Sequence, residues 1–198
     1  MNLILFYDTE TTGLPDWHEP SEAPHQPHIV QLAAKLVDAD TRAVVESLDL
    51  IAAPDGWLIS ADVAAVHGIT TAYAMQVGVP EATVMEALLA LWRRASTRIG
   101  HNESFDARIL RIATKRYASE EVIDAWKAGA AECTVRITKP MLQLEPRNRY
   151  GWKSPKLSEA YAHFMGRPLE NAHNAMADVD ACMAVYFAAK DQLALAVA

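Results

Sequence analysis

The chain has 198 residues, of which 51% are hydrophobic and 22% are charged, and its formal net charge is -7. This length suits a single domain, residues 1–198, with a sizeable core, and the composition excludes an intrinsically disordered chain. The negative charge argues against a broad electrostatic contact with duplex nucleic acid. It does not exclude a nucleic-acid enzyme, because carboxylates gathered around divalent cations also lower the formal charge.

The apolar segments are too short for a membrane protein. No apolar run approaches the roughly 20 residues that a membrane-spanning helix needs, and strand-like sequence follows Met1 directly. We therefore expect no cleaved signal peptide, no membrane contact and a cytoplasmic location. Cys133 and Cys182 match neither a disulfide framework nor a zinc cluster, so we expect both thiols to be reduced.

The first third of the chain predicts three strands. Residues 3–7 form a buried strand, and residues 29–37 and 44–52 form a hairpin around the turn-rich "DADTR". The Pro- and His-rich segment 15–28 lies before the hairpin, and we expect it to be a flexible, solvated loop. The spacing of its possible ligands matches no standard metal site: His18, Glu19, His25 and His28. Whether this loop contacts the substrate is left open.

Helical patterns begin after Pro54. Ser60 is expected to cap a helix that stops at Gly68, and Thr70 is expected to cap the next one. Residues 80–95 then predict a strong amphipathic helix. Its buried stripe consists of Val84, Leu88, Leu91 and Trp92.

The second half of the chain predicts one further strand and mostly helices. Residues 97–102, "TRIGHN", form a short buried strand, and Ser104 is expected to cap the helix that follows. Residues 119–170 contain short helices and loops, and a long helix starts near Ala175. The expected helix breakers are Pro140, Pro146, Pro155 and Pro168. A three-strand meander followed by helices and an inserted strand predicts a mixed α/β sheet covered by helices.

Two acidic residues stand at the end of the first strand. Asp8 and Glu10 are two positions apart, so they point to the same face of a strand, about 7 Å apart at Cα. Such carboxylates repel each other unless a positive partner lies between them, and paired divalent cations are such a partner in phosphoryl chemistry. Taken alone, the D-x-E pattern is more often a turn or capping feature.

Later segments supply further candidates. Asp106 falls in the first turn of a helix, where the helix dipole alone would favour an acid. Asp178 has apolar neighbours one and two turns on, whereas Asp180 points about 200° away and is expected to be a solvated surface acid. His173 is expected in the loop before this last helix, where an imidazole can accept a proton from water near neutral pH.

Three segments in order resemble the motifs of one known family. The chain resembles the DEDDh (DnaQ-like) 3'→5' exonuclease family. The three motifs of that family are similar to "DTETTG", "HNESFD" and "HNAMAD", and a further segment of the family is similar to "VHGIT". The match runs from residue 3 to about residue 188. The sister subgroup would place a tyrosine at Asn174, so His173 fits the histidine type.

The resemblance implies a ribonuclease H-like fold and a metal-dependent reaction. It implies that two Mg²⁺ or Mn²⁺ ions are held by Asp8, Glu10, Asp106 and Asp178. His173 would be the general base that takes a proton from the attacking water. A nucleoside 5'-monophosphate would then leave the 3' end.

The resemblance also implies a pocket for the terminal nucleotide and a set of partners. The matching substrate-binding positions are Thr9, Thr11, Gly13, Leu14, His67, Asn102 and Phe105. The expected partners are single-stranded or frayed DNA or RNA 3' ends. A DNA polymerase or a sliding clamp is a further candidate partner in repair or proofreading, and a homodimer is left open. Two alternatives remain: a catalytically silent module that binds nucleic acid or polymerase, and a nuclease restricted to very short oligonucleotides.

A basic stretch lies between Arg136 and Lys156. It contains six basic residues against one acid, Glu145, with Tyr150 and Trp152 among them. Basic and aromatic side chains together suit single-strand binding, and a solvated charged loop explains them equally well. The C-terminal "DQLALAVA" only faintly resembles a clamp-binding peptide, because it lacks the terminal aromatic residue, and we interpret it as the end of an amphipathic helix.

Overall fold

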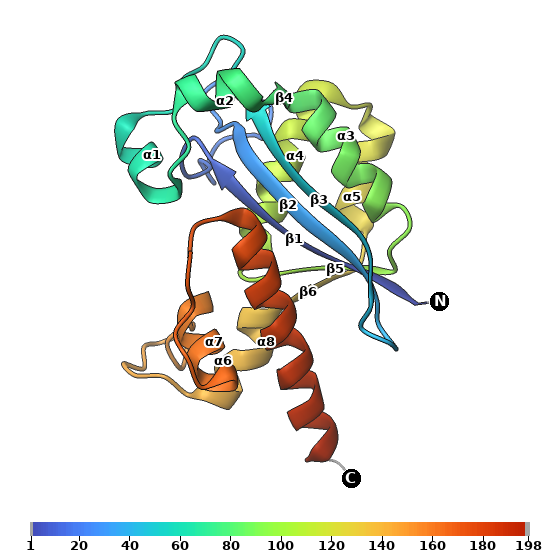
Figure 1. Ribbon diagram of the computed structural model, residues 1–198, viewed down its shortest axis with the longest axis vertical. Coiled ribbons are helices and arrows are strands. Elements are labelled where there is room, and N and C mark those ends of the chain that lie inside the picture. Colours follow the sequence, from blue (N-terminus) through green and yellow to red (C-terminus); the bar gives the residue numbers. More distant parts are fainter. Residues whose placement is uncertain (1, 197–198) are drawn as a thin grey trace.

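Six strands form one mixed sheet in the computed structural model, which describes residues 2–196 (Figure 1). The strand order is β4-β3-β2-β1-β5-β6. β1, β2 and β3 are antiparallel neighbours, whereas β4, β5 and β6 pair in parallel. The bounds are β1 Leu3–Thr11, β2 Ile29–Asp38, β3 Val44–Ala53, β4 Val79–Pro80, β5 Thr97–Gly100 and β6 Ala131–Cys133. The expected ribonuclease H-like mixed sheet with its antiparallel meander is therefore confirmed.

Helices cover both faces of this sheet (Figure 1). Helices α3, α4 and α5 pack on one face, and α8 crosses the other face with α6 and α7 beside it. The short helices α1 and α2 lie at the end of the sheet next to β3 and β4. The bounds are α1 Ala61–His67, α2 Thr71–Val77, α3 Glu81–Trp92, α4 Ser104–Tyr117, α5 Glu120–Ala128, α6 Thr134–Leu142, α7 Leu157–Met165 and α8 Ala175–Leu195.

The central strand β1 is buried because helices lie on both of its faces. Leu5 and Tyr7 pack in the core under α3, α4 and α5, whereas Ile4 and Phe6 pack against α8. Side chains alternate along a strand, so Asp8 and Glu10 continue the face of Ile4 and Phe6 toward α8. Thr9 continues the opposite face toward α4. The apolar pattern of β1 thus fixes which helix each polar residue at its end meets.

Most predicted helix ends agree with the structure. Ser60 Oγ accepts a hydrogen bond from the Val63 N–H at 3.4 Å, and Gly68 ends α1 with a positive φ of 78°. Thr70 caps α2 in the same way. Two expectations were wrong. Ser104 is the first residue of α4 rather than its cap. Pro140 lies inside α6, which ends only two residues later, because a proline removes one backbone donor but permits a short helix to finish.

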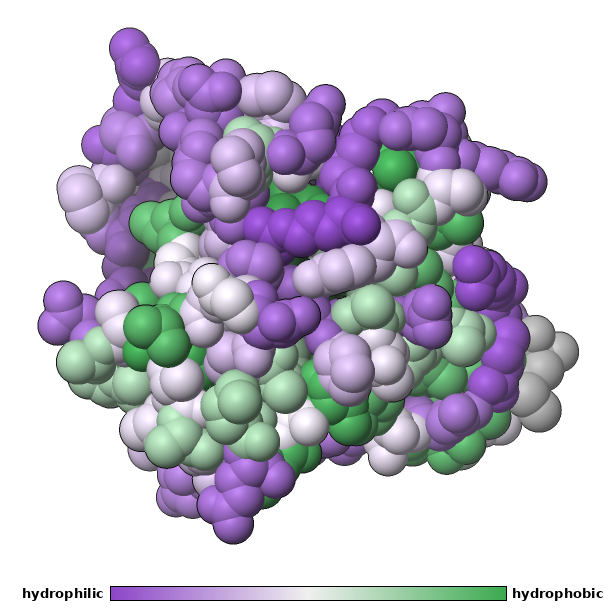
Figure 2. Space-filling model, turned by 90° about the horizontal axis from the view of Figure 1, so that it is seen from above, coloured by the Kyte–Doolittle hydropathy of each residue, from purple (hydrophilic) through white to green (hydrophobic). Residues whose placement is uncertain are grey.

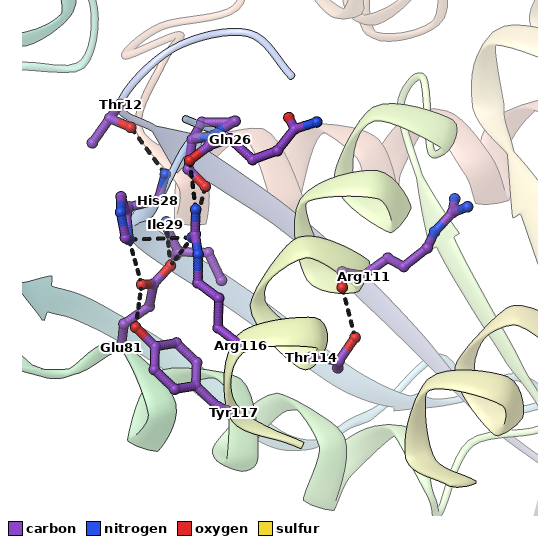
Figure 3. A network of polar contacts seen from close by, with 10 residues as sticks. Thr12, Gln26, His28, Ile29, Glu81, Arg111, Thr114, Arg116 and Tyr117 are labelled. Atoms are coloured by element: carbon purple, nitrogen blue, oxygen red, sulfur yellow. Dashed lines mark hydrogen bonds and ion pairs between the residues drawn. The ribbon is translucent and has the colours of Figure 1, made fainter. Parts of the chain in front are cut away.

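The loop 15–28 is anchored rather than merely solvated, so that expectation was wrong. The buried Gln26 side chain donates to the carbonyls of Asp16 and Pro20 at 2.9 and 3.0 Å. Arg108 of α4 donates to Ser21 Oγ at 2.8 Å. At the base of the loop, the His28 N–H donates to Thr12 Oγ1 at 2.9 Å (Figure 3). These contacts hold the loop against the helix that carries Asp106.

Other features concern the surface and the cysteines. Figure 2 shows the end of the molecule that carries α1 and α2, where hydrophobic side chains form separate small patches among hydrophilic ones. Across residues 2–196, the longest apolar helix still falls short of what crossing a membrane requires. Cys133 and Cys182 are free thiols, as expected.

Candidate active site

The acids expected from the sequence converge where β1 ends beside α4 and α8. Glu10, Asp178 and His173 each place one ligand atom within 4.8 Å of the other two. Asp8 lies outside this tightest group, but the charges of Asp106, Asp178 and Glu10 all act on its carboxyl group. The chain therefore brings together five polar residues from three separate segments.

Asp106 is held in place from β1. Its Oδ1 accepts hydrogen bonds from the Thr9 N–H at 2.9 Å and from Thr9 Oγ1 at 2.7 Å. The preceding Glu103 points into the core, where it accepts from Tyr7 Oη at 2.9 Å and from Arg98 Nε at 2.7 Å. This buried network fixes the start of α4, and therefore the direction in which Asp106 points.

Burial raises the pKa of all four acids, and repulsion within the set adds to the rise for Asp8 and Glu10. Burial, followed by repulsion from Asp178 and Asp106, raises the pKa of Glu10 from 4.5 to about 8. Burial raises the pKa of Asp106 from 3.8 to about 7, although the hydrogen bonds from Thr9 oppose the rise. The pKa values of Asp8 and Asp178 are also raised, chiefly by burial. Within residues 2–196, none of the four forms an ion pair with a lysine or arginine.

The start of α8 arranges His173 and Asp178. Asn174 caps the helix by accepting from the Ala177 N–H at 3.1 Å. His173 lies in the loop before α8, as expected, with a positive φ of 67°, and its N–H donates to Asp178 Oδ2 at 3.1 Å. Asp180 was expected to be solvated, but it is only half-exposed and pairs with Lys35 of β2. The ion pair forms because α8 crosses the sheet at this point.

A mainly apolar pocket of about 250 Å³ opens beside Glu10. Its lining includes six of the seven positions expected to contact a nucleotide: Thr9, Thr11, Gly13, Leu14, His67 and Phe105. The seventh, Asn102, instead lines a neighbouring cavity of about 260 Å³. His67 Nδ1 accepts from the Ile69 N–H at 3.1 Å, so a neutral ring would carry its proton on Nε2. That buried Nε2 has no partner among the described residues.

One residue beside the site was not expected from the sequence. Gln31 of β2 lies directly opposite Glu10 in the sheet, and its Oε1 accepts from the Ala175 N–H at 3.3 Å. Its Nε2 donates to Asp49 at 2.8 Å. The sequence carried an indication of this residue, because Gln31 is the polar residue in the otherwise apolar "IVQLAA". In the structure its side chain is buried. Gln31 therefore joins the sheet to the first turn of α8.

The acid set fits a divalent cation on the chemistry of its donors. Asp178 Oδ1 is buried and has no hydrogen-bond partner among the described residues. Carboxylate oxygens are the ligands that hard cations such as Mg²⁺ and Mn²⁺ prefer. The raised pKa values of these acids mean that their ionised forms lack a positive partner. A cation would be that partner if it bound among Asp8, Glu10, Asp106 and Asp178.

Comparisons with known proteins agree with this geometry. The exonuclease family typified by RNase T matches residues 5–186, and the DEDD exonucleases of this family depend on metal ions. E. coli Exonuclease I in complex with a dT13 oligonucleotide has 24% identity and a TM-score of 0.72, over 94% of this chain and 40% of that one. The zinc-bound form of the E. coli ExoI–ssDNA complex has 23% identity and a TM-score of 0.75, over 97% and 41%.

These solved structures share the fold, and the chain spans about 40% of their length. No curated protein matches the chain at a significant level. The family match covers nearly all of the sequence and includes every acid of the site. The chain belongs to the RNase T/DnaQ-like exonuclease family.

Proposed function

We propose that the chain is a metal-dependent 3'→5' exonuclease that acts on single-stranded or frayed DNA or RNA ends. One observation carries the proposal: the other acids and His173 gather around Glu10, and Glu10 itself lines the 250 Å³ pocket. This volume lies below the ~300–1,000 Å³ of sites for drug-sized ligands, so it suits one terminal nucleotide rather than a longer segment. The product would be a nucleoside 5'-monophosphate.

Each residue has a role that its position permits. Asp8, Glu10, Asp106 and Asp178 would hold two Mg²⁺ or Mn²⁺ ions, which when bound would supply charge stabilisation for an in-line displacement at phosphorus. His173 would accept the proton of the attacking water at its imidazole. The backbone N–H of His173 donates to Asp178 Oδ2, so the residue that carries the base is tied to the acid set through its main chain.

The pocket would orient the strand end. Leu14 lines the pocket and is 84% exposed, so its apolar side chain can contact a base, and Phe105 of α4 also lines the pocket. The unpartnered His67 Nε2 would donate to a polar atom of the nucleotide. Orientation of this kind would select the terminal phosphodiester bond.

The direct test is release of mononucleotides from single strands labelled at the 3' end, with and without Mg²⁺. We expect release by the wild-type chain with Mg²⁺, and a loss of about 100- to 10,000-fold for His173→Ala, the range for a lost general base. Asp40→Asn is the matched control for acid substitutions, because Asp40 is an exposed acid in the β2–β3 turn.

The same assay separates the alternatives. Binding of oligonucleotides without any metal-dependent release would contradict the proposal and indicate a silent binding module. Release from dinucleotides but not from longer strands would indicate a nuclease of very short oligonucleotides. Matched DNA and RNA substrates in the same panel would give the preferred sugar.

A further inference from the structure

We propose that residues 136–156, here called the basic segment, bind the part of a single strand that lies on the 5' side of the terminal nucleotide. The inference rests on the proposed function, because it assigns the path of that substrate. It concerns a surface outside the acid set and outside the 250 Å³ pocket. The ligand groups would be phosphates and bases of single-stranded nucleic acid.

The first observation is unpaired positive charge in an acidic protein. The chain carries a formal net charge of -7. Across residues 2–196, five cations of the basic segment form no ion pair: Arg136, Lys139, Arg147, Arg149 and Lys156. Its one acid, Glu145, instead accepts from the Arg147 backbone N–H at 2.6 Å. These cations are therefore free to meet phosphates.

The second observation is the position of the segment beside the site. His101, in the turn before Asp106, contacts Thr134 Oγ1 at 2.8 Å through Nδ1 and the Pro155 carbonyl at 3.0 Å through Nε2. The turn that leads to the acid set is thus held against Thr134, just before the segment begins, and against Pro155 at the end of the segment. A strand leaving the site along this turn meets the segment next.

A cavity of about 260 Å³ joins the two regions. Its lining includes Asn102 from the site turn and Arg136 and Lys139 from α6. The two acids in its wall are already neutralised. Glu103 pairs with Arg98 at 2.7 Å, and Glu132 pairs with Lys190 at 2.7 Å. The cavity therefore presents positive charge without competing negative charge.

The third observation is a preformed turn that carries an exposed Tyr150 ring and a half-buried Trp152 ring. Asn148 and Gly151 exchange backbone hydrogen bonds, both of 2.9 Å. The Arg147 guanidinium lies 4.2 Å from the Trp152 ring centroid, and Arg149 lies 4.7 Å from that of Tyr150. Tyr150 is 71% exposed.

This turn projects from the side of the molecule between α6 and α7 (Figure 1). Lys139 Nζ donates to the Tyr150 carbonyl at 3.4 Å, which ties the turn to α6. Exposed aromatic rings flanked by cations bind single strands through stacking and phosphate contacts. The chemistry thus favours a nucleic-acid strand over a protein partner.

The test compares two double variants of equal net charge. Arg147→Glu/Arg149→Glu changes the segment. Arg93→Glu/Arg167→Glu changes two arginines outside it that form no ion pair with any residue from 2 to 196. Binding of a labelled single strand of about 12 nucleotides is measured in EDTA at several salt concentrations, with hydrolysis of a dinucleotide in Mg²⁺ as a second readout. A dinucleotide has only one nucleotide on the 5' side of the terminal one, so it tests the acid set and the pocket without a longer strand.

We expect the segment variant to bind the long strand at least about 10-fold more weakly, with a salt slope shallower by about 1.4 for two lost contacts. Tyr150→Ala should weaken binding by about 5- to 100-fold without changing the slope, because it removes stacking alone. Dinucleotide hydrolysis should change less than about twofold. An unchanged slope, or an equal change in the control variant, would overturn the inference. Loss of strand binding in a chain that hydrolyses nothing would support the inference while contradicting the proposed function.

Discussion

The carboxylate of Glu81 and the acid set at the end of β1 behave in opposite ways. Glu81, at the start of α3, is 4% exposed, and its carboxylate meets His28 Nδ1 at 2.7 Å, the Ile29 N–H at 2.8 Å and Tyr117 Oη at 2.9 Å (Figure 3). Burial alone would raise the pKa of Glu81, but these contacts outweigh burial and lower it. Arg116 adds a positive charge 3.6 Å away.

The acid set at the end of β1 lacks this compensation. Burial raises the pKa of Glu10 to about 8, and Asp178 Oδ1 has no partner among the described residues. A buried charge is stable only when it is paired, hydrogen-bonded or bound to metal. The difference indicates that the Glu81 group is closed by the protein itself and serves the fold, whereas the acid set is completed by a ligand.

The largest expected effect is the loss of activity in Asp8→Asn. Release of mononucleotides in Mg²⁺ should fall by about 1,000-fold or more, the upper part of what losing one preorganised electrostatic partner costs. The free energy of unfolding without metal should stay equal or rise, because one repelling charge is removed. A fall in that free energy to the level expected for a Glu81 substitution would contradict the comparison.

The next effect concerns Glu81→Ala. Removing this carboxylate leaves buried donors and Arg116 without their partner, so we expect the free energy of unfolding to fall by about 3 kcal/mol. Denaturant unfolding measures the change. Glu86→Ala is the matched control, because Glu86 is an exposed acid on the same helix, and it should stay within about 0.5 kcal/mol of wild type. Equal effects of the two substitutions would show that the contacts of Glu81 do not stabilise the start of α3.

A third effect is a dependence of stability on pH. Since the folded-state pKa values of Glu10 and Asp106 are raised to about 8 and about 7, the folded chain holds more protons than the unfolded chain above pH 5. The free energy of unfolding of metal-free protein should therefore fall as pH rises from about 5 to 8. Glu81 acts in the opposite direction and below this window, because its lowered pKa contributes stability that is lost only as pH falls below 4.5.

Unfolding curves in EDTA and in saturating Mg²⁺ test this dependence. Bound cations stabilise the ionised acids, so Mg²⁺ should flatten the pH profile between pH 5 and 8. A profile in EDTA that is already flat over this range would mean that the four acids are not electrostatically strained in solution.

Local patterns were sufficient to predict the central elements. The continuous apolar run of β1 and the caps at Ser60, Gly68 and Thr70 are set by residues close in sequence, so they appear in the structure as expected. The short strands β4 and β6 were missed. They have two and three residues and exist only because a distant strand offers backbone partners.

Long-range contacts explain the other differences. The loop 15–28 looked solvated because its anchor, Arg108, lies more than 80 residues away in sequence. Glu81 resembles any acid in the first turn of a helix, and nothing near it in the sequence reveals His28 or Tyr117 as partners. The candidate acids were proposed because three segments in order resemble the motifs of one family, since each acid taken alone also fits a turn or a helix end, whereas Asn102 lines a neighbouring cavity together with residues of α6.

The order of the acids along the chain has a consequence for biosynthesis. Asp8 and Glu10 leave the ribosome first, and Asp178 follows about 170 residues later on a helix that must then dock across β1 and β2. Until Phe6 meets Tyr186 and Gln31 meets Ala175, the set has no fourth acid and His173 has no fixed position. A nascent or partly unfolded chain therefore lacks the complete acid set. Under the proposed function, it would hydrolyse nucleic acid only after α8 has docked on the sheet.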